Sequence, residues 1–211
     1  MSERDDLLAS VTSEIRAYRK RDLPEPTPDH VDRWLHQFTP AQQLPFLREF
    51  DHVIKQTFIT RKKVTGFLRH LVTNQKLAGD DPNAYWSSAK FLSIQKNGQS
   101  QKEMLKLFSK CLKDECGVDL DDCGEDGRDF IYLDDVMFSG NRVGNDLEQW
   151  IVNDAPQSAT VHVIVAALHS GGSYLVEERL KSVVAQSGKK IAVKWWHALK
   201  IENRRTYKNS S

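Results

Sequence analysis

Two adjacent carboxylates, Asp134 and Asp135, follow an apolar run at residues 130–133. The chain then passes through a turn at residues 136–142 into a segment with the apolar spacing of a helix. Two carboxylates at the tip of a strand can hold vicinal hydroxyls or a hydrated magnesium ion. Backbone amides at the start of a helix attract phosphate, because they are unpaired donors at the positive end of the helix dipole. This order of groups therefore suits a sugar phosphate.

The segment FIYLDDVMFSGNR, residues 130–142, resembles the motif that binds 5-phosphoribosyl 1-pyrophosphate (PRPP) in type I phosphoribosyltransferases. That motif has four apolar residues, two acids, two apolar residues, a pair of small residues, a glycine, any residue, and then a small residue or arginine. The segment departs from the motif at Phe138, where the family usually has a small residue such as threonine. We expect this ring to crowd the phosphate loop.

The resemblance implies a role for each residue of the segment. Asp134 and Asp135 would be the catalytic acids, which hold the ribose hydroxyls directly or through a Mg²⁺ ion that accompanies PRPP. The turn would bind substrate, and its last four residues would hold the 5′-phosphate mainly through backbone amides: Met137, Phe138, Ser139, Gly140, Asn141 and Arg142.

Two other loops are expected beside this one, because ligands of open parallel sheets bind beyond the carboxyl ends of the strands. The resemblance implies that Lys96 and Gly98 meet the leaving pyrophosphate, although this loop also suits a plain turn before a helix capped by Ser100. His169 precedes the segment Ser-Gly-Gly on the third loop. It is a candidate substrate contact, and a buried or capping histidine is the alternative.

Three segments together resemble a narrower family, the phosphoribosyltransferase-like (PRTase-CE type) domain of bacterial conflict systems. They are SIQKNGQSQKEML, IYLDDVMFSGNRV and ALHSGG, and the resemblance covers about residues 82–207. It implies an anti-phage defence effector or sensor, sometimes encoded beside retrons, with a partner such as a reverse transcriptase and with a homodimer common among relatives. The chain ends soon after the last expected strand, so we expect a fragment or a short version without a complete hood over the substrate.

The elements that must position these loops follow from the apolar pattern. Up to about residue 80 the pattern is helical, and Thr27-Pro28 and Thr39-Pro40 are two helix starts, each with a capping hydroxyl before a first-turn proline. Beyond it, short apolar runs alternate with helices, as in an α/β parallel sheet. We predict an N-terminal helical lobe at residues 1–80 and a phosphoribosyltransferase-like α/β domain at residues 81–211.

Composition narrows the class of protein. The 211 residues include 30 Lys+Arg and 29 Asp+Glu, and residues 1–89 hold 13 and 12 of these, so neither half is a basic arm for nucleic acid. No apolar stretch approaches the length of a membrane span, and the acidic N-terminus does not resemble a signal peptide. An odd count of 3 cysteines makes a disulfide framework improbable. We therefore expect a cytoplasmic protein that does not bind membranes.

Two functions from different classes follow, and the residues leave both open. The first is a phosphoribosyltransferase-like enzyme that binds PRPP with Mg²⁺ and displaces pyrophosphate at the anomeric carbon. The second is a catalytically inactive module that senses a nucleotide or ribose phosphate and engages a partner through its helical lobe. The balanced charge weakens a third hypothesis, an adaptor that binds nucleic acid.

Overall fold

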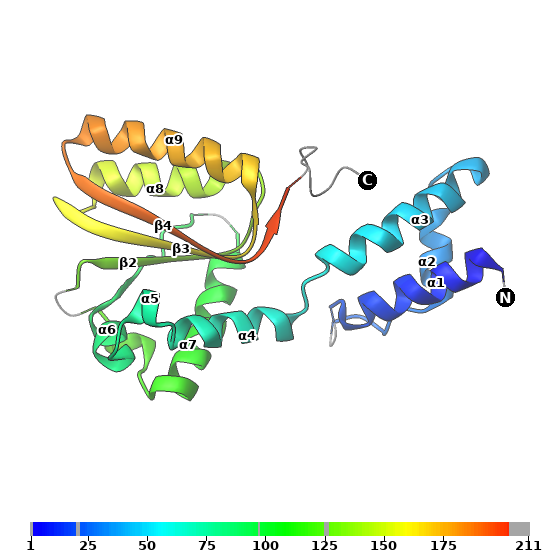
Figure 1. The fold of residues 1–211 in the computed structure, drawn as a ribbon, viewed down its shortest axis with the longest axis horizontal. Helices are drawn as coiled ribbons and strands as arrows, with labels where there is room; N and C mark the ends of the chain where they lie inside the picture. Colours follow the sequence, from blue (N-terminus) through cyan, green and yellow to red (C-terminus); the bar gives the residue numbers. More distant parts are fainter. Residues whose placement is uncertain (1, 20–21, 97, 125–126, 203–211) are drawn as a thin grey trace. The chain divides into compact units, whose positions relative to one another are not determined.

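The computed structural model describes residues 2–19, 22–96, 98–124 and 127–202. The chain divides into two compact units, Met1–Arg61 and Lys62–Ser211 (Figure 1). The sequence analysis placed the boundary at residue 80, whereas this division lies at residue 61. The difference has a physical cause, because the apolar side chains at residues 64–78 pack with the sheet of the second unit.

The first unit consists of helices α1 (Glu3–Glu14), α2 (Pro28–Leu35) and α3 (Pro40–Thr57), with a short 3₁₀ turn η1 (Ile15–Ala17) after α1. Thr27 and Thr39 are the N-cap residues of α2 and α3, each followed by proline at the first helical position, so both predicted helix starts are confirmed. The Thr27 hydroxyl caps α2, whereas the Thr39 hydroxyl donates to the Gln42 side chain. The core of the unit is aliphatic at its centre, with Leu8, Val11, Val31, Leu35 and Leu47 buried.

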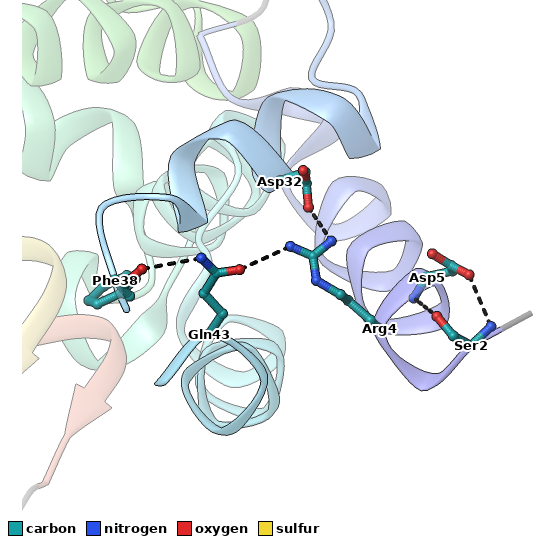
Figure 2. A network of polar contacts seen from close by, with 6 residues as sticks. All are labelled: Ser2, Arg4, Asp5, Asp32, Phe38 and Gln43. Carbon is teal, nitrogen blue, oxygen red and sulfur yellow. Dashed lines mark hydrogen bonds and ion pairs between the residues drawn. The ribbon is translucent and has the colours of Figure 1, made fainter. Parts of the chain in front are cut away.

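Arg4 ties the three helices of the first unit together (Figure 2). Its guanidinium forms an ion pair with Asp32 of α2 and donates a hydrogen bond to Gln43 of α3 at 3.2 Å. At the start of the same helix, Ser2 and Asp5 form a reciprocal capping box that satisfies two backbone amides. The first turn of α1 thus provides both its own N-terminal cap and the polar contacts to α2 and α3.

The second unit is built on a four-stranded sheet in the order β1-β2-β3-β4, with all neighbouring strands parallel (Figure 1). The strands are β1 (Lys90–Phe91), β2 (Asp129–Met137), β3 (Ser158–His169) and β4 (Lys190–Ile201). Helices α7 (Ser100–Cys116), α8 (Asn141–Asn153) and α9 (Ser170–Ser187) connect them, and a short 3₁₀ turn η2 (Leu120–Asp122) follows α7. The predicted α/β class with a parallel sheet is confirmed.

Helices cover both faces of the sheet (Figure 1). On one face, α8 and α9 pack against Tyr132 and Val163 of the two central strands. On the other face, α4 (Arg61–Val72), α5 (Gln75–Ala78), α6 (Pro82–Ser88) and α7 pack against Ile131, Leu133 and Ile164. The α6 side chain Trp86 is fully buried there and donates from its indole nitrogen to the Val72 carbonyl at 2.8 Å. Helices α4 to α6 are therefore part of the α/β unit.

The central strand β2 differs from its prediction in one useful respect. It extends through the acid pair, since Asp134 pairs with Val165 and Met137 pairs with Leu168. Backbone pairing does not depend on side-chain polarity, so the ladder continues past the apolar run. Among the described residues, each helix is too short or too polar to cross a lipid bilayer.

Candidate functional site: three loops at the carboxyl edge of the sheet

The turn after β2 is in direct contact with the first turns of α9, which begins immediately after β3. A Cβ atom placed on Gly172 would lie 1.9 Å from the Phe138 carbonyl oxygen, and one placed on Gly140 would lie 2.2 Å from Val176 Cγ2. Only glycine permits this approach at both positions, because any side chain would displace the neighbouring loop. The segments that follow β2 and β3 therefore lie side by side at the carboxyl edge of the sheet, as expected from the sequence.

The two acids have opposite environments. Asp134 is buried, with 2% of its surface exposed, whereas Asp135 is exposed. Asp134 Oδ1 accepts a hydrogen bond from the Asp135 amide at 2.9 Å, and Asp135 Oδ1 accepts one from the Val136 amide at 2.7 Å. Burial raises the pKa of the Asp134 carboxyl above its ordinary value, and the charge of Asp135 adds to this effect.

A chain of hydrogen bonds leads away from the buried acid. Gln95 donates from Nε2 to Asp134 Oδ2 at 2.8 Å and to the Tyr132 hydroxyl at 3.0 Å. The Tyr132 hydroxyl in turn donates to Asp146 Oδ2 at 2.8 Å. The chain joins β2, the loop after β1 and the helix α8. It fixes the orientation of Asp134 before any ligand arrives.

The sequence predicts a ligand loop at residues 95–99, but it does not predict that Gln95, Tyr132 and Asp146 form a hydrogen-bonded chain to Asp134. One signal was available for Tyr132, because it lies two residues before Asp134 and so shares its face of the strand. Asp146 lies four residues after Arg142, which puts both on one side of α8. That this side of α8 meets that face of β2 depends on tertiary packing and has no signal in the order of residues.

Gln101 anchors the loop after β1. Its side chain is buried, and Oε1 accepts hydrogen bonds from the backbone amides of Ile94 at 2.9 Å and Gln95 at 3.0 Å. Its amide nitrogen lies 3.5 Å from the Leu133 carbonyl. One polar side chain of α7 thus joins the loop to the strand that carries the acid pair.

The candidate cations of the site lie close to one another. A Cβ atom placed on Gly98, whose φ is +102°, would lie 3.2 Å from Arg142 Nη1, so the guanidinium rests against the loop after β1. Lys96 and Arg142 are both exposed. Burial of Asp146 raises the pKa of its carboxyl, and the positive charges of Arg142 and Lys96 partly offset that rise. The structure therefore brings Lys96, Gly98 and Arg142 together.

The turn between β2 and α8 has the form expected of an anion-binding turn. Gly140 has φ +78° and precedes the first residue of α8, and the Ser139 hydroxyl accepts from the Asn141 amide at 3.4 Å. Ser139 and Asn141 are exposed. Met137 differs from the rest, because its side chain is buried in the core and only its backbone is available to a ligand.

His169 caps α9 in the structure. Its Nδ1 accepts a hydrogen bond from the Gly172 amide at 3.3 Å, as in the capping alternative considered for this residue. The imidazole also lies against the Phe138 ring, with 4.6 Å between ring centroids and 38° between planes. Phe138 itself is 61% exposed, so its ring is turned towards solvent and is not buried in the phosphate turn.

Comparison with protein families gives one result that decides the family. The model of the PRTase-CE family matches residues 31–211, which is most of the chain. The chain belongs to the PRTase-CE family. Comparisons with curated proteins and with solved structures gave no significant match. The PRTase-CE match includes all three segments of the candidate site, together with α3 and the part of α2 from residue 31 onwards.

The candidate site contains two neighbouring carboxylates, Asp134 and Asp135, whose suitability for a metal ion can be compared with known binding modes. Among the described residues, no group of three or more His, Cys, Asp or Glu side chains could hold a metal ion alone. Magnesium commonly binds through one or two carboxylates and completes its shell with water and substrate phosphates. Asp134 and Asp135 match that number of carboxylates, but only Asp135 is exposed, and the oxygens of Asp134 already accept hydrogen bonds from Gln95 and from the Asp135 amide. The site thus combines two carboxylates, two cations and a glycine turn within three neighbouring loops.

Proposed function

We propose that the protein binds PRPP or a related ribose phosphate at the carboxyl edge of the sheet. One observation carries the proposal: an acid pair and a glycine turn that opens a helix lie on one segment, and Arg142 of that segment contacts a second loop, which carries Lys96. A ligand with vicinal hydroxyls and phosphates at both ends matches this arrangement. The family match supports a phosphoribosyltransferase-like domain.

Each loop has a role in the proposal. Asp134 and Asp135 hold the ribose hydroxyls, with Asp134 already oriented by Gln95. The backbone amides from Ser139 to Arg142 hold the 5′-phosphate at the positive end of α8. In the loop after β1, the Lys96 ammonium group and the backbone at Gly98 hold the pyrophosphate.

If the protein is an enzyme, the reaction is a displacement at the anomeric carbon of the ribose. A bond forms from the acceptor to this carbon, and the bond to pyrophosphate breaks with its electron pair leaving on the phosphate oxygen. Magnesium, when bound by Asp134, Asp135 and the ligand, supplies positive charge beside the leaving group. The protein supplies fixed charges around the oxocarbenium-like transition state and no nucleophile of its own.

A sensor that binds the same ligand without turnover is the second candidate. The hydrogen-bond chain around Asp134 supports it as well as it supports the enzyme, because it prepares a binding site and supplies no base for an acceptor. Release of pyrophosphate from PRPP in the presence of nucleobases distinguishes them. Turnover favours the transferase, and saturable binding without release favours the sensor.

The family resemblance also motivates a cellular proposal. We propose that the protein is an anti-phage defence effector or sensor of the cytoplasm, where its three free cysteines would stay reduced. A partner encoded beside it, such as a retron reverse transcriptase, and a second copy of the chain are the proposed protein contacts. Co-purification with that partner and light scattering of the isolated protein test these two contacts.

Calorimetric titration of PRPP with magnesium tests the proposed ligand. We expect saturable binding to the wild type and its loss in Asp134→Asn/Asp135→Asn. The matched control is Asp121→Asn/Asp122→Asn, which neutralises an adjacent acid pair in the 3₁₀ turn η2, on the segment between α7 and β2. Equal binding by both double variants would show that the acid pair of β2 is not the ligand site.

A further inference from the structure

Phe138 is an exposed aromatic residue in a turn whose next four residues are small or polar. Phe138 as a residue keeps 61% of its surface exposed. Exposed large aromatic side chains beside polar groups are characteristic of surfaces that bind a partner or ligand. The proposed binding of ribose phosphate does not use this ring.

The ring is held in place from behind. The imidazole of His169 lies against it at 4.6 Å between centroids, and the Gly172 amide fixes that imidazole through Nδ1. The Phe138 backbone is fixed too, because its carbonyl oxygen lies where a Cβ of Gly172 would be. The Phe138 ring therefore has His169 on one side, a backbone packed against α9, and most of its surface open to a ligand.

The position of the ring relative to the phosphate turn identifies a fitting ligand. Phe138 and Gly140 are two residues apart, so their Cα atoms lie within about 7 Å of each other. In a nucleotide, a single ribose separates a flat base from the 5′-phosphate. One nucleotide can therefore contact the phosphate turn and the aromatic ring together.

We propose that Phe138, supported by His169, stacks the base of a nucleoside 5′-phosphate whose phosphate occupies the turn at Ser139–Arg142. This inference rests on the proposed function and names its ligand class more narrowly. Every base has a π-face, so stacking on a phenyl ring tolerates purines and pyrimidines alike. Stacking on the Phe138 ring then distinguishes a nucleotide from a ribose phosphate without a base. The backbone amides of the turn bind the phosphate of either ligand.

The test compares two probes on the full chain by calorimetry, adenosine 5′-monophosphate and ribose 5-phosphate. In the wild type, we expect the nucleotide to bind about tenfold more tightly than the sugar phosphate. Phe138→Ala weakens nucleotide binding by about fivefold to a hundredfold, the range of a lost base stack, and leaves ribose 5-phosphate within about twofold. Phe138→Trp retains the advantage of the nucleotide.

Leu175→Ala is the matched control, because Leu175 is 65% exposed on the neighbouring helix α9 and its loss leaves both affinities unchanged in this account. If Phe138→Ala changes neither affinity, or lowers both equally, the proposal that Phe138 stacks a base is contradicted, whereas the proposed phosphate site is not. If the wild type binds ribose 5-phosphate as tightly as the nucleotide, the inference alone fails. If it binds neither probe, the proposed function fails and the inference falls with it.

Discussion

At the scale of single residues, Gly140 determines how the phosphate turn is built. It has φ +78° and ψ −4°, and an added Cβ would lie 2.2 Å from Val176 Cγ2. A left-handed backbone is costly for other residues, and here the contact with α9 adds a second cost. The turn and helix α9 are therefore fitted to each other around this one residue.

We predict that Gly140→Ala destabilises the protein by about 2 to 4 kcal/mol, from backbone strain and overpacking together. Gly117→Ala is the matched control, because Gly117 has φ 70° and ψ 4° but no atom within 4 Å of an added Cβ. It should cost only the backbone term, about 1 to 2 kcal/mol. Urea unfolding of both variants measures the difference, and equal losses would contradict the contact with Val176.

His162 is a buried histidine on β3 whose charge is unfavourable. It is 2% exposed, its Nδ1 lies 3.0 Å from the Trp196 indole nitrogen, and its Nε2 lies 3.3 Å from Asp129 Oδ1. Burial lowers its pKa below the ordinary value of 6.5, Asp129 opposes this shift and Lys194 adds to it. Below pH 6.5, the unfolded chain therefore takes up a proton that the folded protein does not hold.

Stability should consequently fall as the pH decreases from about 6.5 towards the lower pKa of the folded state. We predict that His162→Gln is less stable than the wild type near pH 7.5 and that its deficit shrinks towards pH 5. The pKa of His197 is also lowered, so the stability of His162→Gln should keep part of the pH dependence of the wild type. Thermal unfolding across this range measures it, with exposed His36→Gln as control; a constant deficit would contradict the assignment.

At the scale of elements, the loop after β1 depends on α7. The Gln101 side chain accepts from two consecutive loop amides, and Gln95 of that loop holds Asp134. Because the acid is oriented through the loop and the loop through the helix, a change at Gln101 should reach the ligand. Helix α7 is in this sense part of the site, although its side chains do not include a candidate ligand contact.

We predict that Gln101→Leu weakens PRPP binding by about tenfold or more and costs about 1 to 3 kcal/mol of stability, since two amides lose their acceptor. Gln99→Leu, an exposed position one residue before α7, is the control and should change neither. Calorimetry and urea unfolding on the same samples separate the two effects. Retention of full affinity by a destabilised Gln101→Leu would show that the loop does not orient the acid.

The strands and helices of this unit were largely predictable, because each has an apolar pattern of its own. One of the short apolar runs, Thr160 to Leu168, lies within β3, which extends it by two residues at its start and one at its end. The acid pair and the glycine turn were found from their order along the chain. The chain from Gln95 through Tyr132 to Asp146 was not, since it depends on which faces of two elements meet in space.

The start of helix α9 after His169 is a second feature that depends on contacts between elements and is not predictable from the local sequence. The residues with strong helical preference begin at Tyr174, after Ser170-Gly171-Gly172-Ser173, whereas the helix α9 begins at Ser170. Serine and glycine are poor helix formers, and the cap from His169 together with the close packing of Gly172 outweighs that preference. Tertiary contacts, not propensity, determine this boundary.

At the scale of the whole molecule, the helices before the sheet decide where the α/β unit begins. Leu68, Leu71 and Val72 of α4 are buried together with Trp86 in the core that covers one face of the sheet. Removal of these residues would expose Ile131 and Leu133, which are fully buried. The unit that binds ligand should therefore need residues that precede position 81.

We predict that a fragment of residues 62–211 unfolds cooperatively and binds PRPP like the full chain. A fragment of residues 81–211 should lose cooperativity or aggregate, because large apolar areas of the sheet would face water. Circular dichroism melting and calorimetry compare the two. A stable, ligand-binding 81–211 fragment would show that α4 and α5 are dispensable and that the boundary at residue 80 is the functional one.

The central claim is that three loops at one edge of the sheet bind a ribose phosphate, and a crystal structure of the protein with PRPP and Mg²⁺ tests it most directly. The account predicts density for the ribose hydroxyls beside Asp134 and Asp135, and for the 5′-phosphate against the amides that open α8. Density for the ligand elsewhere on the molecule, or no ligand at saturating concentration in a well-ordered crystal, would contradict it.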